Sequence, residues 1–494
     1  MRLSMPTKLF IISVIAIPFS DFAAILPLGE LDRELSAYLF IITMCFVIAS
    51  HLQLRKAQGE QSVRFASTYP LPQIMSLLLI IIGISFIMNF PAMLHGNFRG
   101  RVPMNKFLTS LLVVLYGFGL AYISYYLGQK ESWHRLIVRP VAISVAITSL
   151  VAIFEMISWF GGVFDSAYAV LSSMVHLGPV TRGYGSALAG WSSDIEGRVR
   201  SICFEPPALA NYAGFAWPWV YAGIYSARKK AKPAYIALWL LCTGLVIVAM
   251  SRTSFVLLAG NIVVLLLLRT IYLSPQPKEP IVHRTVSFFI MSLTAIAIVA
   301  FLFNTDNVTS YIISGTNVSN ISRFASITAA FRMFADSPIW GYGFGQYGFH
   351  ILDYMPSWGY YSWEIRMWLV NPFAVWPPVF SIYARFAAEL GILGLVAWIG
   401  IWFVLARSIW RITLAYQHAT GKVLLMSYPL IISCYCVLFS GIALDSMRTP
   451  MMWITLGLGC CYLRQTRFLV LQHQHDLGKV PETPIASDNP VAAV

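Results

Sequence analysis

Arginine dominates the basic residues in one set of polar segments of this sequence, where only Lys106 accompanies it. A guanidinium group presents a planar fork of donors that matches a phosphate bidentately, whereas an ammonium group acts as a point charge. The set therefore predicts phosphate binding. The alternative, for part of the set, is that the side chains simply face solvent or lipid headgroups. Its members are Arg99, Arg101, Arg182, Arg198, Arg200, Arg323, Arg332 and Arg366.

Two further arginines lie within or beside apolar runs. Arg252 separates two such runs with almost no loop, and Arg385 lies near one end of another. A charge at membrane depth is costly and usually marks a functional pathway, so both are candidate anion ligands. For Arg252 the alternative is a simple turn with a side chain that extends back to the interface.

A carboxylate stands directly before a helix that begins with two prolines. Pro206 and Pro207 suit a first helical turn, and Glu205 would be favoured there as an anion by the helix dipole. Glu205 is therefore a candidate catalytic base. The alternatives are that it only caps the helix or pairs with Arg198 or Arg200.

Residues 322–348 are predicted to form an amphipathic helix, lying on the outer membrane surface or on the helix bundle, followed by a glycine-aromatic turn. Ser322 is a plausible N-cap, and an apolar face follows at spacings of three to four residues, at Phe324, Ile327, Phe331 and Phe334. Arg323 would then lie in the first turn beside free backbone N–H groups, a good place for an anion. At about 100° per residue, Arg332 faces the opposite side. Asp336-Ser337-Pro338 ends the helix.

The turn alternates glycine with aromatic residues from Gly341 to Gly348. Glycine lets a backbone approach a ligand closely, and flat rings offer faces to a sugar. Tyr342, Phe344 and Gln346 are thus candidate sugar-binding residues, with an aromatic belt at a membrane interface as the alternative. No strand precedes the run and no Lys-Ser/Thr follows it, so neither a dinucleotide site nor a P-loop is indicated.

The elements that position these residues are predicted to cross a membrane. Of the 494 residues 58% are hydrophobic and 11% are charged, whereas soluble domains have about 45–50% and about 25%. The apolar runs are about 20 residues long, as spanning helices require. The expected fold is an all-α polytopic membrane protein with about twelve spans, near 9–27, 35–52, 71–90, 107–127, 136–160, 206–226, 233–250, 253–272, 285–303, 379–406, 423–443 and 450–464.

Charge determines the expected topology. The net charge of +13 comes from Lys and Arg in alternate short loops, which places both termini in the cytoplasm and argues against nucleic-acid binding. The seven cysteines indicate no disulfide framework, and no motif indicates a metal site. We expect spans with an outward loop at about 161–205 (residues 1–303), a large folded outward loop (304–376), final spans (377–464) and a disordered cytoplasmic tail (465–494).

Four features of the sequence resemble the O-antigen ligase and O-antigen polymerase superfamily, the Wzy-type membrane glycosyltransferases. They are Ser251-Arg252-Thr253 at the start of an apolar helix, the segment from Arg323 to Gly345, the segment Phe386 to Leu395 with Glu389 and Gly391, and two unequal outward loops. The resemblance implies a GT-C-like helical enzyme in the bacterial inner membrane with its active site facing the periplasm. It also implies undecaprenyl-pyrophosphate-linked glycans as substrates, no metal or nucleotide sugar, and membrane lipids, a chain-length regulator and a flippase as candidate partners.

Within the superfamily, the residues favour a polymerase over a ligase. Ligases resemble one another in a His-Asn pair late in the large loop, where this chain has Asn371 without a histidine; His350 lies about twenty residues earlier. Glu205-Pro206 and the residues that follow are similar to a motif of polysaccharide polymerases. The alternative within the superfamily is a ligase that transfers glycan to lipid A-core.

The expected mechanism places the lipid diphosphate among Arg252, Arg323, Arg200 and Arg385, while Glu205, or secondly His350, takes the proton of an acceptor hydroxyl. Two other classes compete with an enzyme. A lipid or solute transporter would often show repeated halves, which this sequence lacks. A non-catalytic assembly partner would leave the arginines unexplained.

Overall fold

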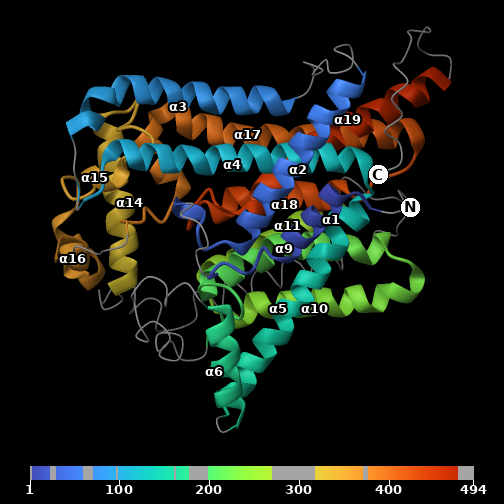
Figure 1. The fold of residues 1–494 in the computed structure, drawn as a ribbon, viewed down its shortest axis with the longest axis horizontal. Coiled ribbons are helices and arrows are strands. Elements are labelled where there is room, and N and C mark those ends of the chain that lie inside the picture. Colours follow the sequence, from blue (N-terminus) through green and yellow to red (C-terminus); the bar gives the residue numbers. More distant parts are fainter. Residues whose placement is uncertain are drawn as a thin grey trace.

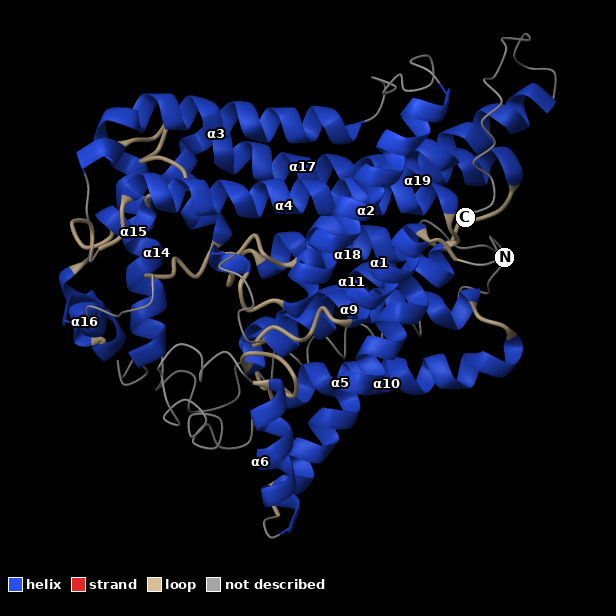
Figure 2. Ribbon diagram, in the orientation of Figure 1, coloured by secondary structure: helices blue, strands red, loops and turns tan. Residues whose placement is uncertain are grey.

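A computed structural model describes residues 3–22, 29–58, 70–95, 98, 100–160, 163–176, 198–269, 318–370 and 376–476. In these ranges the regular elements are helices, with one isolated bridge between Phe98 and Arg101 (Figure 2). Five helices are long and apolar enough to cross a membrane, at Pro70–Leu94, Pro103–Lys130, His134–Ser158, Lys229–Val248 and Ile382–Thr420. The protein is therefore an all-helical, multi-pass membrane protein. The expected span at 285–303 lies outside the described residues.

The long helices form a bundle. α3 (Pro70–His95), α4 (Pro103–Lys130) and α17 (Ile382–Thr420) run in nearly the same direction, and α10 (Lys232–Val248) follows below them (Figure 1). The other helices that complete the bundle are α1 (Met5–Ile15), α2 (Leu35–Gln58), α5 (Arg139–Ser158), α9 (Pro206–Ser226), α11 (Arg252–Leu267) and α18 (Ser427–Ser440). α6 (Val163–Val175) packs against α5 and buries none of its own side chains fully.

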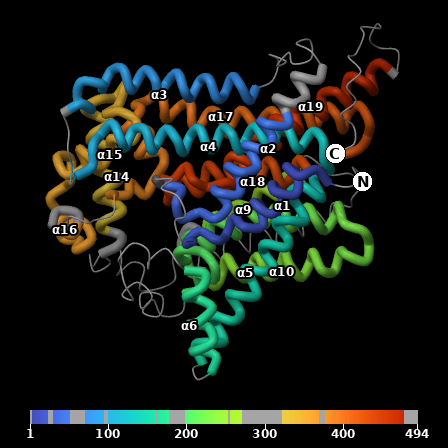
Figure 3. Tube along the Cα trace, in the orientation of Figure 1, coloured from blue at the N-terminus to red at the C-terminus, as the bar shows by residue number. Residues whose placement is uncertain are grey.

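Small residues let the central helices approach closely. α4 packs against α19 (Pro450–Asp476), and the Trp453 ring occupies the space that a side chain at Gly117 would take. On the other helix, Gly457 lies against the carbonyl group of Ala121. Close approach at small residues is how helices associate where lipid removes the hydrophobic driving force. The tube view shows α4 and α19 lying side by side although they are far apart in sequence (Figure 3).

A second, smaller core lies across one end of the bundle. α14 (Val318–Asp336) runs across the direction of α3, α4 and α17, with α15 (Tyr347–His350) and α16 (Trp363–Val370) beside it (Figure 1). The buried side of α14 packs against the start of α17 and the turns after α14 through Ala325, Ala329, Ala330 and Met333. The turn that joins α9 to α10 lies at the other end of the bundle.

The structure corrects one expectation about α14 and narrows another. The helix begins at Val318, so Ser322 is inside it and bonds Glu364 instead of capping it. Arg323 therefore lies beyond the first turn and has no free backbone N–H groups beside it. The predicted apolar face does not pack on the bundle, because Phe324 and Phe331 are 60% and 48% exposed, so of its two expected placements the outer membrane surface remains. Alanines permit closer approach to α17 than rings would, and they form the buried face instead. The predicted end at Asp336 is confirmed.

The glycines after α14 serve contact between two backbones. Gly343 donates its N–H to the carbonyl of Glu389 at 3.0 Å, and Ile392 donates to the carbonyl of Pro338 at 2.8 Å. α17 breaks between these contacts at Gly391, which has φ 67° and ψ −161°. A side chain at Gly341 would overlap the backbone of Glu389. The run thus joins α14 to the kink of α17.

We predict that Gly391→Ala destabilises the protein by at least about 2 kcal/mol, because this backbone region is open essentially only to glycine and a Cβ would overlap the Ile339 carbonyl. The thermal unfolding midpoint of the purified protein in detergent measures the effect. Gly400→Ala is the control in the same helix: its Cβ meets open space, and alanine favours a helix by up to about 1 kcal/mol. Equal midpoints for the two variants would contradict the assignment of Gly391 to a strained contact.

Candidate functional site

A cavity of about 180 Å³ lies where the ends of several helices meet. Its wall comes from the residues after α1, from the segment between η1 (Gly29–Leu31) and α2, and from the first residues of α9 and α19. The two helix N-termini at Pro206 and Pro450 direct the positive ends of their dipoles to this place, which favours an anion. Its polar lining consists of Ser20, Arg33, Glu34, Glu205, Asn211, Ser446, Arg448 and Thr449.

Glu205 has no structural role that the described residues reveal. It occupies the N-cap position of α9 with φ −152° and ψ 161°, yet its side chain makes no capping hydrogen bond. The residue is accessible from the cavity, which it lines. The protein atoms packed around the Glu205 carboxyl still remove part of its solvent and so raise its pKa, against the attraction of nearby arginines. The capping alternative raised by the sequence is therefore wrong, and the carboxylate is left available.

Four arginines act on Glu205 electrostatically. Arg323 and Arg198 have the larger influence, followed by Arg448 and Arg33. Arg323 comes from α14 and lies over the Phe380 ring at 5.5 Å, and its buried Nε has no hydrogen-bond partner among the described residues. The electrostatic environment of Glu205 therefore combines arginines from segments before α2, α9 and α19 with one arginine from α14.

Sequence reasoning missed Arg33 and Arg448. Arg33 lies 4.9 Å from the centre of the Phe204 ring, and Arg448 donates to Ser446 Oγ at 3.0 Å and to the Glu30 carbonyl at 2.8 Å. The sequence did contain an indication of their role. Both residues lie in short loops between predicted spans, and the alternation of loops places these on the same side of the membrane as the other candidate arginines. The prediction did not include them because it was centred on the two long loops.

Arg200 belongs to a different cluster from Glu205. It is 8% exposed, its Nη2 donates to Ser172 Oγ at 3.4 Å, and its backbone N–H lies 3.4 Å from Glu155 Oε1. The chain turns sharply after it, at Ser201 with φ 53°. This turn separates Arg200, which faces α5 and α6, from Arg198, which acts on Glu205. The structure thus does not bring Arg200 to the cavity.

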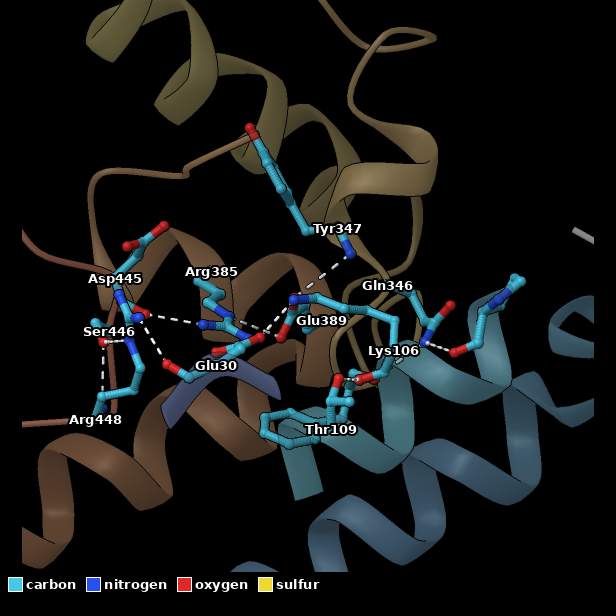
Figure 4. A network of polar contacts seen from close by, with 12 residues as sticks. Glu30, Lys106, Thr109, Gln346, Tyr347, Arg385, Glu389, Asp445, Ser446 and Arg448 are labelled. Atoms are coloured by element: carbon cyan, nitrogen blue, oxygen red, sulfur yellow. Dashed lines mark hydrogen bonds and ion pairs between the residues drawn. The ribbon is translucent and has the colours of Figure 1, made fainter. Parts of the chain in front are cut away.

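Arg385 is buried in an ion pair within α17. Its Nε donates to Glu389 Oε2 at 3.1 Å and its Nη1 to the Asp445 carbonyl at 3.0 Å (Figure 4). The backbone N–H of Tyr347 also points to Glu389, at 3.4 Å from Oε1. Arg385 therefore joins the turn after α14 to the segment before α19, and its donors are used for structure.

The same network reaches the cavity through Glu30. Lys106 forms an ion pair with Glu30, whose carbonyl accepts from Arg448 (Figure 4). Burial raises the pKa of Glu30, but Lys106, Arg385 and Arg448 outweigh it and lower this pKa to about 2. Glu30 thus stays ionised and helps to fix Arg448 at the cavity wall.

Of the three residues of the glycine-aromatic turn that were expected to contact sugar, only Tyr342 is accessible. Phe344 is fully buried, and Gln346 is 2% exposed and donates to the Pro103 carbonyl at 3.1 Å. Neither presents a surface that a sugar can reach. Tyr342 is partly exposed; its hydroxyl bonds Asp336, and its ring lies 4.8 Å from that of His350. Burial lowers the pKa of His350, which is not among the groups that act on Glu205.

Arg252 and Arg332 complete the placement of the candidate arginines. Arg252 is the first residue of α11, and its side chain lies outside the described part of the structure. The preceding turn is close to the site, because Arg198 Nε approaches the Ala249 carbonyl at 3.5 Å. Arg332 is exposed and donates to the Tyr354 carbonyl at 3.3 Å, away from Arg323 as expected. Among the described residues, no three His, Cys, Asp or Glu side chains gather to hold a metal ion.

Comparison with known proteins gives one match. The family model described as O-antigen ligase matches residues 236–399. The matched region contains α10, α11, α14 and the kink of α17, and hence Arg252, Arg323 and Glu389. The search of curated proteins finds no match.

We predict that Glu389→Leu alone destabilises the protein by about 3 kcal/mol, because it leaves the Arg385 guanidinium buried without its partner. The double variant Arg385→Met, Glu389→Leu should be less destabilised than either single variant. Thermal unfolding in detergent measures all three. Single variants that unfold no earlier than the double variant would show that the pair does not hold this part of the bundle.

Proposed function

We propose that this chain, whose residues 236–399 match the O-antigen ligase family model, polymerises lipid-linked oligosaccharide repeat units. The match supports a glycosyl-transferring membrane enzyme that acts on lipid-linked glycans. The finer proposal is a periplasm-facing enzyme of the inner membrane whose donor is an undecaprenyl-pyrophosphate-linked glycan. A transporter would not account for this match.

The observation that carries the proposal is Glu205 in a cavity lined by Arg33 and Arg448, without a capping hydrogen bond among the described residues and under the electrostatic influence of these two arginines and of Arg198 and Arg323. A diphosphate leaving group gains negative charge in the transition state, and fixed cations stabilise that charge without reorganisation. Arg323, Arg198, Arg448 and Arg33 would supply these cations. Arg252 remains a proposed ligand because the turn before it lies beside Arg198. Arg200 and Arg385 instead hold the surrounding segments.

The proposed reaction is a single displacement at the anomeric carbon of the donor sugar. The oxygen of the acceptor hydroxyl forms the new bond, the bond to the diphosphate oxygen breaks with its electron pair on the diphosphate, and the hydroxyl proton passes to Glu205. We assign this proton to Glu205 over His350, which packs against Tyr342 and is not among the groups that act on Glu205. The charge that develops on the leaving group is then matched by guanidinium groups.

A ligase is the second candidate, because the matching family model is described as O-antigen ligase. Polymerase and ligase share a lipid-diphosphate donor and differ in the acceptor: another lipid-linked glycan or a lipid A-core. We favour the polymerase on Glu205-Pro206-Pro207 and on the missing histidine before Asn371, a residue outside the described part of the structure.

We predict that Arg323→Ala and Arg252→Ala abolish polymer in cells while the protein remains in the membrane, because each removes a cation from the diphosphate site. Extraction of the lipid carrier identifies the reaction: single repeat units should accumulate for a polymerase and full-length polymer for a ligase. Arg332→Ala is the matched control, since this exposed side chain is on the same helix as Arg323 and points away. Normal polymer from both Arg323→Ala and Arg252→Ala would refute the arginine assignment.

We predict that Glu205→Gln lowers kcat by about 10²–10⁴-fold, which is the usual contribution of a general base, and changes KM little. Elongation of a purified lipid-linked repeat unit by the purified enzyme measures both constants. Asp353→Asn, an exposed carboxylate after α15, controls for the loss of one negative charge. Retention of native kcat in Glu205→Gln would exclude Glu205 as the base.

A further inference from the structure

A second carboxylate, Glu34, lines the same cavity and has no part in the mechanism above. It follows η1 and directly precedes α2. Its side chain forms no hydrogen bond or ion pair of its own within the described ranges, whereas the neighbouring Glu30 is paired with Lys106. A carboxylate placed in a cavity without a structural partner is available to a ligand.

The charges around Glu34 differ from those around Glu205. Burial and the nearby Asp21 disfavour its ionised form, and only Arg448 and Arg33 favour it. Burial raises the pKa of Glu34 to about 7, although Arg448 and Arg33 oppose this rise and Asp21 adds to it. The titratable and charged groups that face it come from five segments: Asp21 after α1, Arg33 beside it, Tyr116 of α4, Cys203 and Glu205 before α9, and Arg448 before α19.

A bound diphosphate makes ionisation of Glu34 harder still. The ligand takes over the donors of Arg33 and Arg448, which are the only groups that favour the charged form, and it adds negative charge of its own. In a cavity of about 180 Å³, an ionised Glu34, an ionised Glu205 and a diphosphate would repel one another. A protonated carboxyl removes this repulsion and gains an O–H donor that can bond a phosphate oxygen.

We propose that Glu34 is part of the diphosphate site as a neutral acid that donates a hydrogen bond to a phosphate oxygen, so that the cavity binds an isoprenoid diphosphate when Glu34 is protonated. This inference rests on the proposed function, because it requires the diphosphate to lie among the same arginines. It gives the two cavity carboxylates opposite states, with Glu205 ionised as the base and Glu34 neutral as a ligand. Environments that separate two carboxyl groups in this way are a known pattern of active sites.

The proposal determines the sign of a pH effect on binding. Below its pKa Glu34 is protonated and binds; as the pH rises through about 7 it ionises and the affinity for a diphosphate falls. If only the protonated form binds, the apparent Kd rises about tenfold one pH unit above the pKa. In Glu34→Gln the amide keeps an N–H donor but cannot ionise, so this loss should disappear.

We predict that the ratio of the Kd of the native protein to that of Glu34→Gln, measured by calorimetry with farnesyl diphosphate and the full chain in detergent, is near one at pH 6 and about tenfold at pH 8. Titration of the ligand itself cancels in this ratio. Glu34→Ala should also lose the pH dependence, but with weaker binding at pH 6 because no donor remains. Asp165→Asn, an exposed carboxylate of α6, should follow the native protein.

Three outcomes would overturn parts of the proposal. A ratio that stays constant between pH 6 and pH 8 in both Glu34 variants excludes Glu34 but leaves the arginine-lined site. Failure of the native protein to bind farnesyl diphosphate at either pH refutes the diphosphate site, and with it the proposed function. In elongation assays the rise of KM with pH that Glu34 imposes should disappear in Glu34→Gln; a loss of kcat like that of Glu205→Gln would show proton transfer in place of ligand binding.

Discussion

The contact between the turn after α14 and the kink of α17 determines where the candidate site can form. Two backbones meet there through hydrogen bonds from Gly343 and Ile392, and neither segment tolerates a Cβ at the closest points, Gly341 and Gly391. The contact holds α14 across the end of the bundle (Figure 1). Together with the packing of the α14 alanines against the start of α17, it sets the position from which Arg323 acts on Glu205. The conformational freedom of glycine thus has a direct consequence for the electrostatics of the cavity.

Arginine plays two physically different roles in this protein. Arg385 and Arg200 are buried and bonded to protein acceptors, and their charge is matched by Glu389 and Glu155. Such residues satisfy the surrounding structure and have few donors left for a ligand. Around the cavity, by contrast, Arg33 and Arg448 line the wall beside the carboxylates Glu34 and Glu205, and Arg198 and Arg323 add positive charge that acts on Glu205 from outside the lining. An excess of fixed positive charge in a small space is the arrangement that an anionic leaving group requires.

The sequence predicted the helical membrane class, the end of α14 and the opposite orientations of Arg323 and Arg332, because these follow from hydropathy and helical period. It failed where the outcome depends on contacts between distant segments. The buried face of α14 is made of alanines because α17 approaches it closely, which no local pattern reveals. Gly341 and Gly343 suggested a ligand, yet they serve a backbone contact with Glu389, about fifty positions away. Arg33 and Arg448 come from opposite ends of the chain, so only the fold shows that they share a cavity.

None of the described residues that line the cavity lies in the matched family region. Residues 236–399 contribute Arg323, which acts on Glu205 from outside the lining, whereas Arg33, Glu34, Glu205 and Arg448 come from segments before and after them. The network of Glu30, Lys106 and Arg385 connects these parts, because Arg385 lies in the matched region while Glu30 holds Arg448 through its carbonyl (Figure 4). The charge balance of the site is therefore a property of the whole bundle. Removal of a buried member of this network, such as Arg385, would displace a cavity arginine that it never touches, and a loss of activity there would reflect position rather than chemistry.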